Sequence, residues 1–204
     1  MSAATSRIVD AVTAALFHGD EMYMVQRHPG MSVFPGFHAF PGGKVDPEDS
    51  DLPLEHPILA AHPPRLMRAL HRELQEELAF DLIGACESGQ VQRICEVGVA
   101  LTPPVQPLRF NTHFYKIVFA DKPELVADPG ESISSLWGTP SALWQRYEEG
   151  QMLLAPPTYL ALRAFSLDPG CEHIRELSHE FREKTELPMV EPQRGVRTIF
   201  VRSN

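Results

Sequence analysis

The chain has 204 residues, 43% of them hydrophobic and 22% charged, which is the composition of an ordinary globular protein. Its formal net charge of −9 argues against non-specific nucleic-acid binding, which needs a basic face. No stretch approaches the ~20 apolar residues of a membrane span, so neither nucleic acid nor a membrane is an expected partner.

The predicted elements combine short strands with a few helices. In chain order they are strands at 8–17 and 22–27, a loop leading into a short strand at 28–45, a proline-broken surface insertion at 46–64, a helix at about 65–79, strands at 97–101, 109–120 and 133–137, helices at 141–150, 156–165 and 171–184, and an edge strand at 198–201. Strands interleaved with helices predict one mixed α/β domain over 1–204, with 167–204 as a helical extension and tail.

Three cysteines, Cys86, Cys95 and Cys171, are widely spaced and form no CxxC pair. This pattern predicts reduced thiols in a cytosol-like compartment and neither a disulfide framework nor a zinc knuckle. The C-terminal VRSN does not resemble the peroxisomal Ser-Lys-Leu signal, so a cytoplasmic location is the expectation.

The segment RELQEE, residues 72–77, places three carboxylates in one helix. At about 100° per residue, Glu73 and Glu77 point along the leucine stripe of that helix and Glu76 flanks it. A solvated face is the ordinary interpretation of a charge run, but Arg, His and Gln already occupy the solvent side here. Semi-buried carboxylates in contact need raised pKa values or a cation. Because oxygen-only ligands suit hard ions, the cluster predicts a Mg²⁺ or Mn²⁺ site.

Upstream, FPGGKVDPED contains the pair Gly42-Gly43, whose backbone can approach a metal or a phosphate closely. Taken together, the two segments resemble the Nudix box, which runs Gly, five residues, Glu, seven residues, then Arg-Glu-apolar-any-Glu-Glu-any-Gly-apolar. Five residues after Gly43 the chain has Asp49 where the box has Glu, although Glu48 counts equally well from Gly42. Ala79 replaces the last Gly of the box.

The box is also interrupted, because 22 residues separate Asp49 from Arg72. An insertion of this kind, together with the stretch VQRHPGMSVFPGFHAFPGGKVD, resembles the Nudix branch of coenzyme A and acyl-CoA diphosphatases. The resemblance covers roughly residues 6–166. It implies an α/β/α sandwich around a mixed sheet, here with extra C-terminal helices.

The resemblance implies metal-dependent cleavage of the diphosphate bridge in a nucleoside diphosphate derivative. It assigns the ion to Glu73, Glu76, Glu77 and the Gly43 carbonyl, with Glu73 and Glu76 also counted as catalytic. Arg72 and Asp49 would form a structural salt bridge. CoA or acyl-CoA would give 3′,5′-ADP and (acyl-)phosphopantetheine.

Other roles are open at this stage. Glu131 is a candidate general base or a surface turn acid. Arg27, with Gly42 and Gly43, is a candidate substrate-binding residue, and a structural salt bridge is its alternative role. Phe34, Phe37 and Phe114 are candidates for stacking on adenine, although strand spacing favours a core role.

Three functions compete. The preferred one is a CoA or acyl-CoA diphosphatase whose partner is a small nucleotide-diphosphate substrate, with a homodimer left open. The second is a Nudix hydrolase of ADP-ribose, NADH or another nucleotide, since substrate choice lies outside the box. The third is a non-catalytic nucleotide-binding domain, against which the intact acids count. The proline-rich insertion is expected to cover the active site, so that replacing residues 51–62 would alter KM more than stability.

Overall fold

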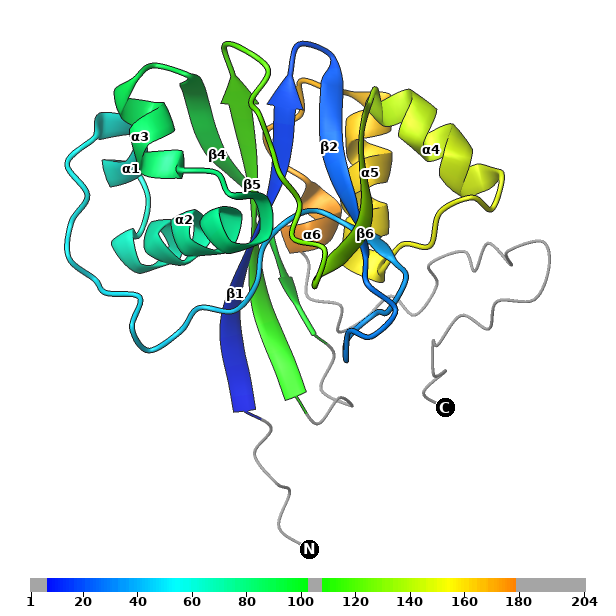
Figure 1. Ribbon diagram of the computed structural model, residues 1–204, viewed down its shortest axis with the longest axis horizontal. Helices are drawn as coiled ribbons and strands as arrows, with labels where there is room; N and C mark the ends of the chain where they lie inside the picture. The colour runs from blue at the N-terminus through cyan, green and yellow to red at the C-terminus, as the bar shows by residue number, and fades with distance from the viewer. Residues whose placement is uncertain (1–6, 103–107, 179–204) are drawn as a thin grey trace, which may run out of the picture.

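The protein folds as a mixed six-stranded β-sheet with helices on both faces, as the computed structural model shows (Figure 1). The structure describes residues 7–102 and 108–178. The predicted α/β sandwich with C-terminal helices is confirmed.

Most elements lie close to their predicted positions, but β4 begins well before the strand predicted at 97–101. The strands are β1 (Arg7–His18), β2 (Glu21–Arg27), β3 (His38–Ala39), β4 (Val91–Leu101), β5 (Leu108–Phe119) and β6 (Ser132–Gly138). The helices are α1 (Pro57–Ala60), α2 (Pro64–Leu78), α3 (Leu82–Glu87), α4 (Pro140–Glu148), α5 (Pro156–Leu167) and α6 (Arg175–Ser178).

Three helices differ from the sequence prediction. The four-residue α1 lies in the segment 46–64, which was predicted to be irregular. The short α3 was not predicted, because six residues carry too little periodicity to signal a helix. Within the described part of the predicted 171–184 helix, α6 begins only at Arg175. The predicted edge strand at 198–201 lies outside the described residues.

The sheet has the order β3-β2-β1-β5-β4, with β6 paired to β2. β1 and β5 run parallel over their whole length, while β1 and β2 form an antiparallel hairpin. In that turn Gly19 has φ +58°, a left-handed conformation that glycine adopts without strain.

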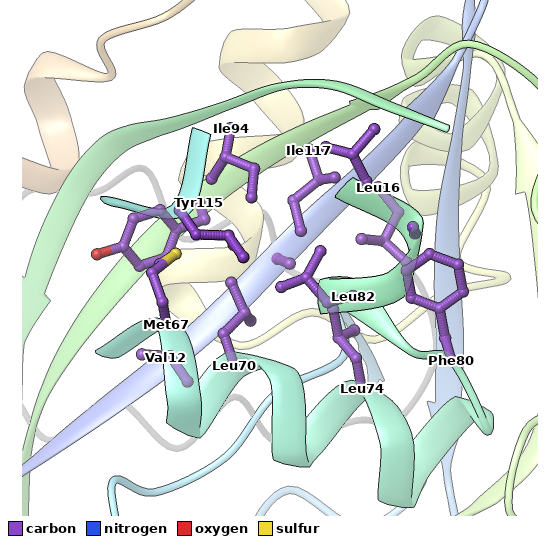
Figure 2. Packing of buried hydrophobic residues seen from close by; sticks show 14 of the residues in the cluster. Val12, Leu16, Met67, Leu70, Leu74, Phe80, Leu82, Ile94, Tyr115 and Ile117 are labelled. Atoms are coloured by element: carbon purple, nitrogen blue, oxygen red, sulfur yellow. The ribbon is translucent and has the colours of Figure 1, made fainter. Parts of the chain in front are cut away.

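Apolar residues form one core on each face of the sheet. α1, α2 and α3 cover one face, and α4, α5 and α6 cover the other (Figure 1). Figure 2 shows Leu70 and Leu74 of α2 directed toward the sheet, where Leu16 and Ile117 lie. The leucine stripe predicted for α2 is therefore the stripe that holds this helix on the sheet.

Part of the insertion is buried and has a structural role, while its expected role as a cover beside the active site stays a prediction. Leu54 and Leu59 are 9% and 1% exposed and belong to the core beneath α2. Arg68 of α2 donates to the carbonyl oxygens of Leu52 and Pro53, so the insertion runs along the solvent side of the helix. Its apolar residues complete the core, which the irregular proline spacing did not reveal.

Ala79 follows the last residue of helix α2 and takes the left-handed conformation, at φ 52° and ψ 34°. Its N–H donates to Gln75 O, and Phe80 N–H donates to Leu74 O. This is the usual glycine position of a helix C-terminus, and a non-glycine residue there costs roughly 1–2 kcal/mol.

Ala79→Gly is therefore expected to raise the free energy of unfolding by roughly 1 kcal/mol, because it relieves the left-handed strain. Part of the gain is offset by the greater entropy of glycine in the unfolded chain. Urea denaturation measures the change. A loss of stability would show that the alanine methyl group, and not the backbone conformation, dominates at this site.

Candidate active site

Helix α2 brings its acids to one edge of the buried stripe. Glu77 is only 8% exposed, and the Glu73 side chain is 13% exposed. The Glu76 side chain is 58% exposed and lies at the rim. Two of the three box glutamates are thus buried against the sheet, because they share the helix face of Leu70 and Leu74.

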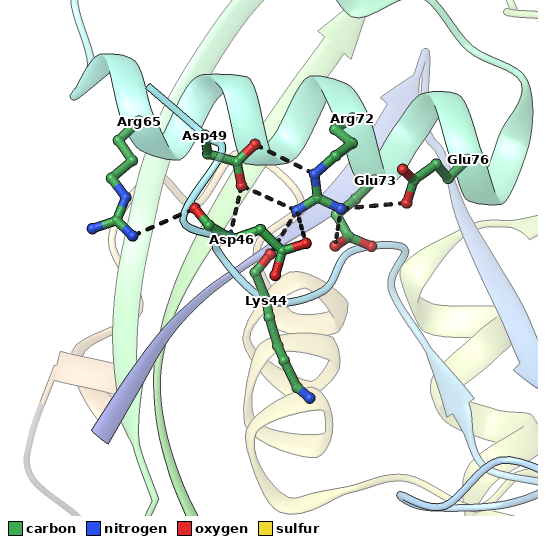
Figure 3. A network of polar contacts seen from close by, with 7 residues as sticks. All are labelled: Lys44, Asp46, Asp49, Arg65, Arg72, Glu73 and Glu76. Atoms are coloured by element: carbon green, nitrogen blue, oxygen red, sulfur yellow. Dashed lines mark hydrogen bonds and ion pairs between the residues drawn. The ribbon is translucent and has the colours of Figure 1, made fainter. Parts of the chain in front are cut away.

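Arg72 binds the acids around it into one network (Figure 3). Its guanidinium donates to both Asp49 oxygens, at 3.3 and 3.1 Å, and to Glu73 Oε1 at 2.8 Å. It also reaches Glu76 Oε2 at 3.3 Å and the Lys44 carbonyl oxygen at 2.8 Å. These partners, with the Asp49 hydrogen bond first among them, raise the pKa of Arg72. Arg72 therefore positions acids and has little capacity left for a substrate.

The first acid of the box is Asp49 in this geometry. Asp49 is 7% exposed and also accepts a hydrogen bond from Asp46 N–H at 2.8 Å. Glu48 is exposed to solvent. The insertion between Asp49 and Arg72 leaves this pair intact because it loops out along the helix and returns.

The glycine pair packs directly on the glutamates. Gly42 N–H donates to Glu77 Oε2 at 2.9 Å, and a Cβ on Gly42 would lie 2.2 Å from the Val12 carbonyl oxygen. A Cβ on Gly43 would lie 2.4 Å from a carboxylate oxygen of Glu73. The Gly43 carbonyl accepts Val12 N–H at 2.9 Å, which leaves one of its lone pairs. A side chain at Gly42 would collide with the backbone of β1, and one at Gly43 would displace Glu73.

Glu131 reaches the same acids from a distant part of the chain. Val126 N–H and Asp128 N–H donate to the carbonyl oxygens of Leu78 and Glu77, which ties this loop to the end of α2. The Glu131 carboxylate acts electrostatically on the Glu77 carboxyl group and raises its pKa.

The cluster is short of positive charge. Burial, with Glu131 and Glu73 adding to it, raises the pKa of Glu77 to about 8, against the opposing hydrogen bond from Gly42. Burial also raises the pKa of Glu73, although Arg72 opposes the shift. Such shifts at neighbouring carboxyls mark a functional site or a place for a cation.

The donors fit a hard divalent cation, since they are carboxylate and carbonyl oxygens. Within residues 7–102 and 108–178, no three His, Cys, Asp or Glu side chains are already arranged so that they could hold a metal ion. The reason lies in the contacts above: Arg72 holds Glu73 and Glu76, while Glu77 faces Gly42 and Glu131. Loading an ion would require the acids to turn from these partners.

The raised pKa of Glu77 predicts that the metal-free protein loses stability as pH rises. Above its ordinary value of 4.5 and up to about 8, the folded chain keeps a proton that the unfolded chain has released. The free energy of unfolding should then fall by about 1.4 kcal/mol per pH unit for one proton. Urea denaturation in EDTA measures this slope.

The useful window for this measurement lies between about pH 6.5 and 8. Burial lowers the pKa of His38 to about 4, so this histidine gives the opposite slope below its ordinary value of 6.5. Glu77→Gln serves as the reference, because glutamine does not titrate. An equal slope in both proteins would contradict the prediction.

The other candidate residues lie near the site or away from it. Arg27 ends β2, and its Nε donates to Val33 O at 3.0 Å, so it braces the 28–37 loop. That loop joins the Glu131 loop through His28 N–H, which donates to Glu131 O at 2.6 Å. Phe34 is 45% exposed and its ring lies 5.2 Å from that of Phe37. Phe114 is buried in the core on the opposite face and is excluded as a stacking residue.

Sequence reasoning did not single out Tyr23. Tyr23 is 2% exposed on the α2 face of β2, and Glu77 acts electrostatically on its hydroxyl. The only signal in the sequence was a polar-ended aromatic residue in an otherwise apolar strand, which does not by itself indicate a site.

None of the helices in the described part of the chain has the length and apolar character needed to cross a membrane. Neither a family model nor a curated protein matches the sequence.

Solved structures do resemble the fold. A Nudix hydrolase from Alicyclobacillus acidocaldarius has a TM-score of 0.64 and 24% identity, over 81% of this chain and 94% of that one. The MutT protein from Methanosarcina mazei has a TM-score of 0.55 and 14% identity, over 82% and 99%. The dihydroneopterin triphosphate pyrophosphohydrolase of E. coli has a TM-score of 0.52 and 14% identity, over 78% and 95%. The chain therefore has the fold of the Nudix hydrolases.

Proposed function

We propose that the chain is a divalent-cation-dependent diphosphatase that hydrolyses the diphosphate bond of a nucleoside diphosphate derivative. The observation that carries this proposal is the meeting of buried Glu77 with half-buried Glu73 and Glu131 beside Gly42 and Gly43. Glu73 and Glu77 come from α2 and Glu131 from a remote loop, and the raised pKa values of Glu73 and Glu77 are those of a site that lacks a cation. The similarity in fold to Nudix hydrolases supports the same reaction class.

Each residue has a separate part in the proposed reaction. Glu73 and Glu77, with Glu76 at the rim, would hold Mg²⁺ or Mn²⁺, which when bound would neutralise diphosphate charge and acidify a water molecule. Glu131 accepts the proton of the attacking water, since it reaches the site on a loop outside α2. Arg72 and Asp49 fix the orientation of the helix acids, and the glycines let the diphosphate approach the backbone.

The proposed substrate is CoA or an acyl-CoA. Its support is the resemblance of residues 25–46 and of the interrupted box to the CoA diphosphatase branch. The proposed location is cytoplasmic, for which the three free thiols are the support.

A hydrolysis screen tests the function. The purified protein is incubated with Mg²⁺ or Mn²⁺ and with CoA, acetyl-CoA, longer acyl-CoAs, ADP-ribose, NADH or nucleoside triphosphates. Product masses locate the broken bond, and we expect 3′,5′-ADP with (acyl-)phosphopantetheine. A tenfold or greater preference in kcat/KM for ADP-ribose or NADH would overturn the proposed substrate but keep the reaction class. Tenfold corresponds to about 1.4 kcal/mol of transition-state stabilisation. Binding without hydrolysis of any substrate would favour the non-catalytic alternative.

Phe34→Ala is expected to raise KM for the nucleotide substrate about 5–100-fold with little change in kcat, if Phe34 stacks on the base. Phe34 has φ 49°, an unusual backbone conformation for a bulky residue. Its ring is exposed, and its loop is hydrogen-bonded to Glu131 through His28. Steady-state kinetics measure both constants.

The matched control for Phe34→Ala is Val126→Ala. Val126 is also a large exposed apolar residue, at 62%, and it lies in the loop that carries Glu131. Unchanged KM in Phe34→Ala, or an equal rise in both variants, would remove Phe34 from the substrate site.

A further inference from the structure

Two of the three cysteines lie on the same face of the sheet. Cys95 of β4 and Cys171, which follows α5, both pack against the core that α4, α5 and α6 cover. Both are partly exposed, and their thiols are free. The third thiol, that of Cys86, is buried in the core on the opposite face. Only Cys95 and Cys171 are therefore placed to react with one another.

A buried lysine joins the surroundings of the two thiols. Lys116 of β5 is the cross-strand partner of Cys95, and the Cys95 sulfur lies 3.9 Å from the Lys116 carbonyl oxygen. The Lys116 side chain is 3% exposed, and its Nζ donates to the carbonyl oxygens of Pro169 and, at 3.4 Å, of Cys171. The backbone of Cys171 is thus held no farther from the residue opposite Cys95 than the length of one lysine side chain.

Two further contacts flank Cys95 along its own strand. Arg93, two residues before it, forms an ion pair with Glu172. Val97, two residues after it, accepts the N–H of Ile174 through its carbonyl oxygen at 2.6 Å. The chain that follows Cys171 therefore crosses β4 between these two contacts, which is where Cys95 lies.

The Cys171 side chain is turned along this crossing segment. Its thiol donates to the carbonyl oxygen of His173 at 3.2 Å. Residue 173 stands between the residues that bind Arg93 and Val97, so the sulfur of Cys171 faces the middle of this stretch of β4.

We propose that Cys95 and Cys171 are a modification site, at which a hydroperoxide forms a reversible disulfide that clamps the 171–174 segment to the edge strand β4. Such a bond needs Cα atoms about 4.4–6.8 Å apart, a separation that the contacts on both sides of Cys95 favour. Reversible disulfides that respond to oxidants are the kind found in proteins whose thiols are otherwise reduced. The proposal does not depend on the proposed function, because the pair lies across the sheet from the acids of α2.

The reaction balances with hydrogen peroxide as the oxidant. The Cys171 thiolate attacks one peroxide oxygen, which gives a sulfenic acid and, after protonation of the leaving hydroxide, water. The Cys95 thiol then attacks the sulfenic sulfur, forms the S–S bond and releases a second water molecule. Two thiols lose two electrons and two protons, and one peroxide becomes two water molecules. Burial raises the pKa of Cys95, so the first step is assigned to Cys171.

Peptide mass mapping without reducing agent tests the link in the full chain after peroxide treatment. We expect one pair of peptides that joins Cys95 to Cys171, lighter by two hydrogen atoms and separated by dithiothreitol. The number of titratable thiols in the unfolded protein should fall from three to one, that of Cys86. The melting temperature should rise by about 4 °C or more on oxidation, because the bond restricts the unfolded chain.

Three variants assign the roles of the thiols. Cys86→Ala is the matched control and should form the link as the wild type does. Cys95→Ser should stop at the sulfenic acid of Cys171, which dimedone labels. Cys171→Ser should give neither the label nor the link. Peroxide should leave the melting temperature of both serine variants without the rise seen in the wild type.

Other outcomes would overturn the proposal. These are three free thiols in the wild type after peroxide treatment, a link through Cys86 or between two chains, or a lower melting temperature in the oxidised protein. Turnover in the hydrolysis screen should be equal in the reduced and oxidised protein. A protein that hydrolyses nothing but forms the link would overturn the proposed function and leave the disulfide in place.

Discussion

Glu77→Gln is expected to lower kcat about 10²–10³-fold, the usual loss when one preorganised charged group leaves an active site. The change keeps the shape of the side chain, and the amide oxygen can still accept Gly42 N–H. It removes one of the few carboxylates proposed to bind the cation, together with its negative charge. Turnover of the best substrate in the screen, at saturating Mg²⁺ or Mn²⁺, measures the effect.

Stability should move in the opposite direction. In the metal-free protein below about pH 8, Glu77 keeps a proton beside Glu131. A glutamine amide can donate to the Glu131 carboxylate at any pH, so the metal-free melting temperature should hold or rise. The stabilisation of the wild type by millimolar Mn²⁺ should shrink in the variant, since ion binding and folding are linked.

Two further variants sharpen the test of Glu77. Glu73→Gln should behave like Glu77→Gln, because Glu73 is the other buried acid one turn away. Gln75→Glu adds a charge on the exposed side of α2 and should leave both turnover and metal response unchanged. A Glu77→Gln protein with wild-type turnover and metal affinity would return the cluster to an ordinary charged helix edge.

The part of the site that lies on one helix could be predicted from sequence, because helical spacing fixes direction. The 100° rotation per residue placed Glu73 and Glu77 along the leucine stripe and Glu76 beside it, and their burial follows that order. The strands were equally readable, since most are long and carry apolar residues. The pairing of β1 with β5 was not, because contacts between residues about 100 positions apart leave no local pattern.

The remaining site features depend on such distant contacts. Glu131 looked equally like a turn acid until its loop was seen to bond to the end of α2. Phe114 lies in the core and Phe34 is exposed in a loop, a difference that aromatic spacing alone cannot reveal. Sequence periodicity thus reports which side of a helix or strand is buried, but not which other element packs against that side.

The insertion inside the box yields the second large effect, a loss of stability. Leu59 lies in α1, which packs against α2, α3 and β4, and its side chain is 1% exposed. Leu59→Ala is expected to lower the free energy of unfolding by about 2–5 kcal/mol, because it leaves a cavity in a packed core. Kinetic constants measured well below the melting temperature should stay near wild type, since α1 lies on the side of α2 away from Glu131. Urea denaturation and steady-state kinetics measure the two effects separately.

Leu52→Ala is the matched control for Leu59→Ala, in the same insertion. Leu52 is 68% exposed, so its truncation should change stability by less than about 0.5 kcal/mol. If Leu52→Ala raised KM while Leu59→Ala cost little stability, the insertion would be a substrate cover after all. A large loss of stability in Leu59→Ala with an unchanged KM in Leu52→Ala would instead give the insertion a structural role. Leu59 packs in the same core as the first turns of α2, and the position of α2 brings Arg72 within reach of Asp49.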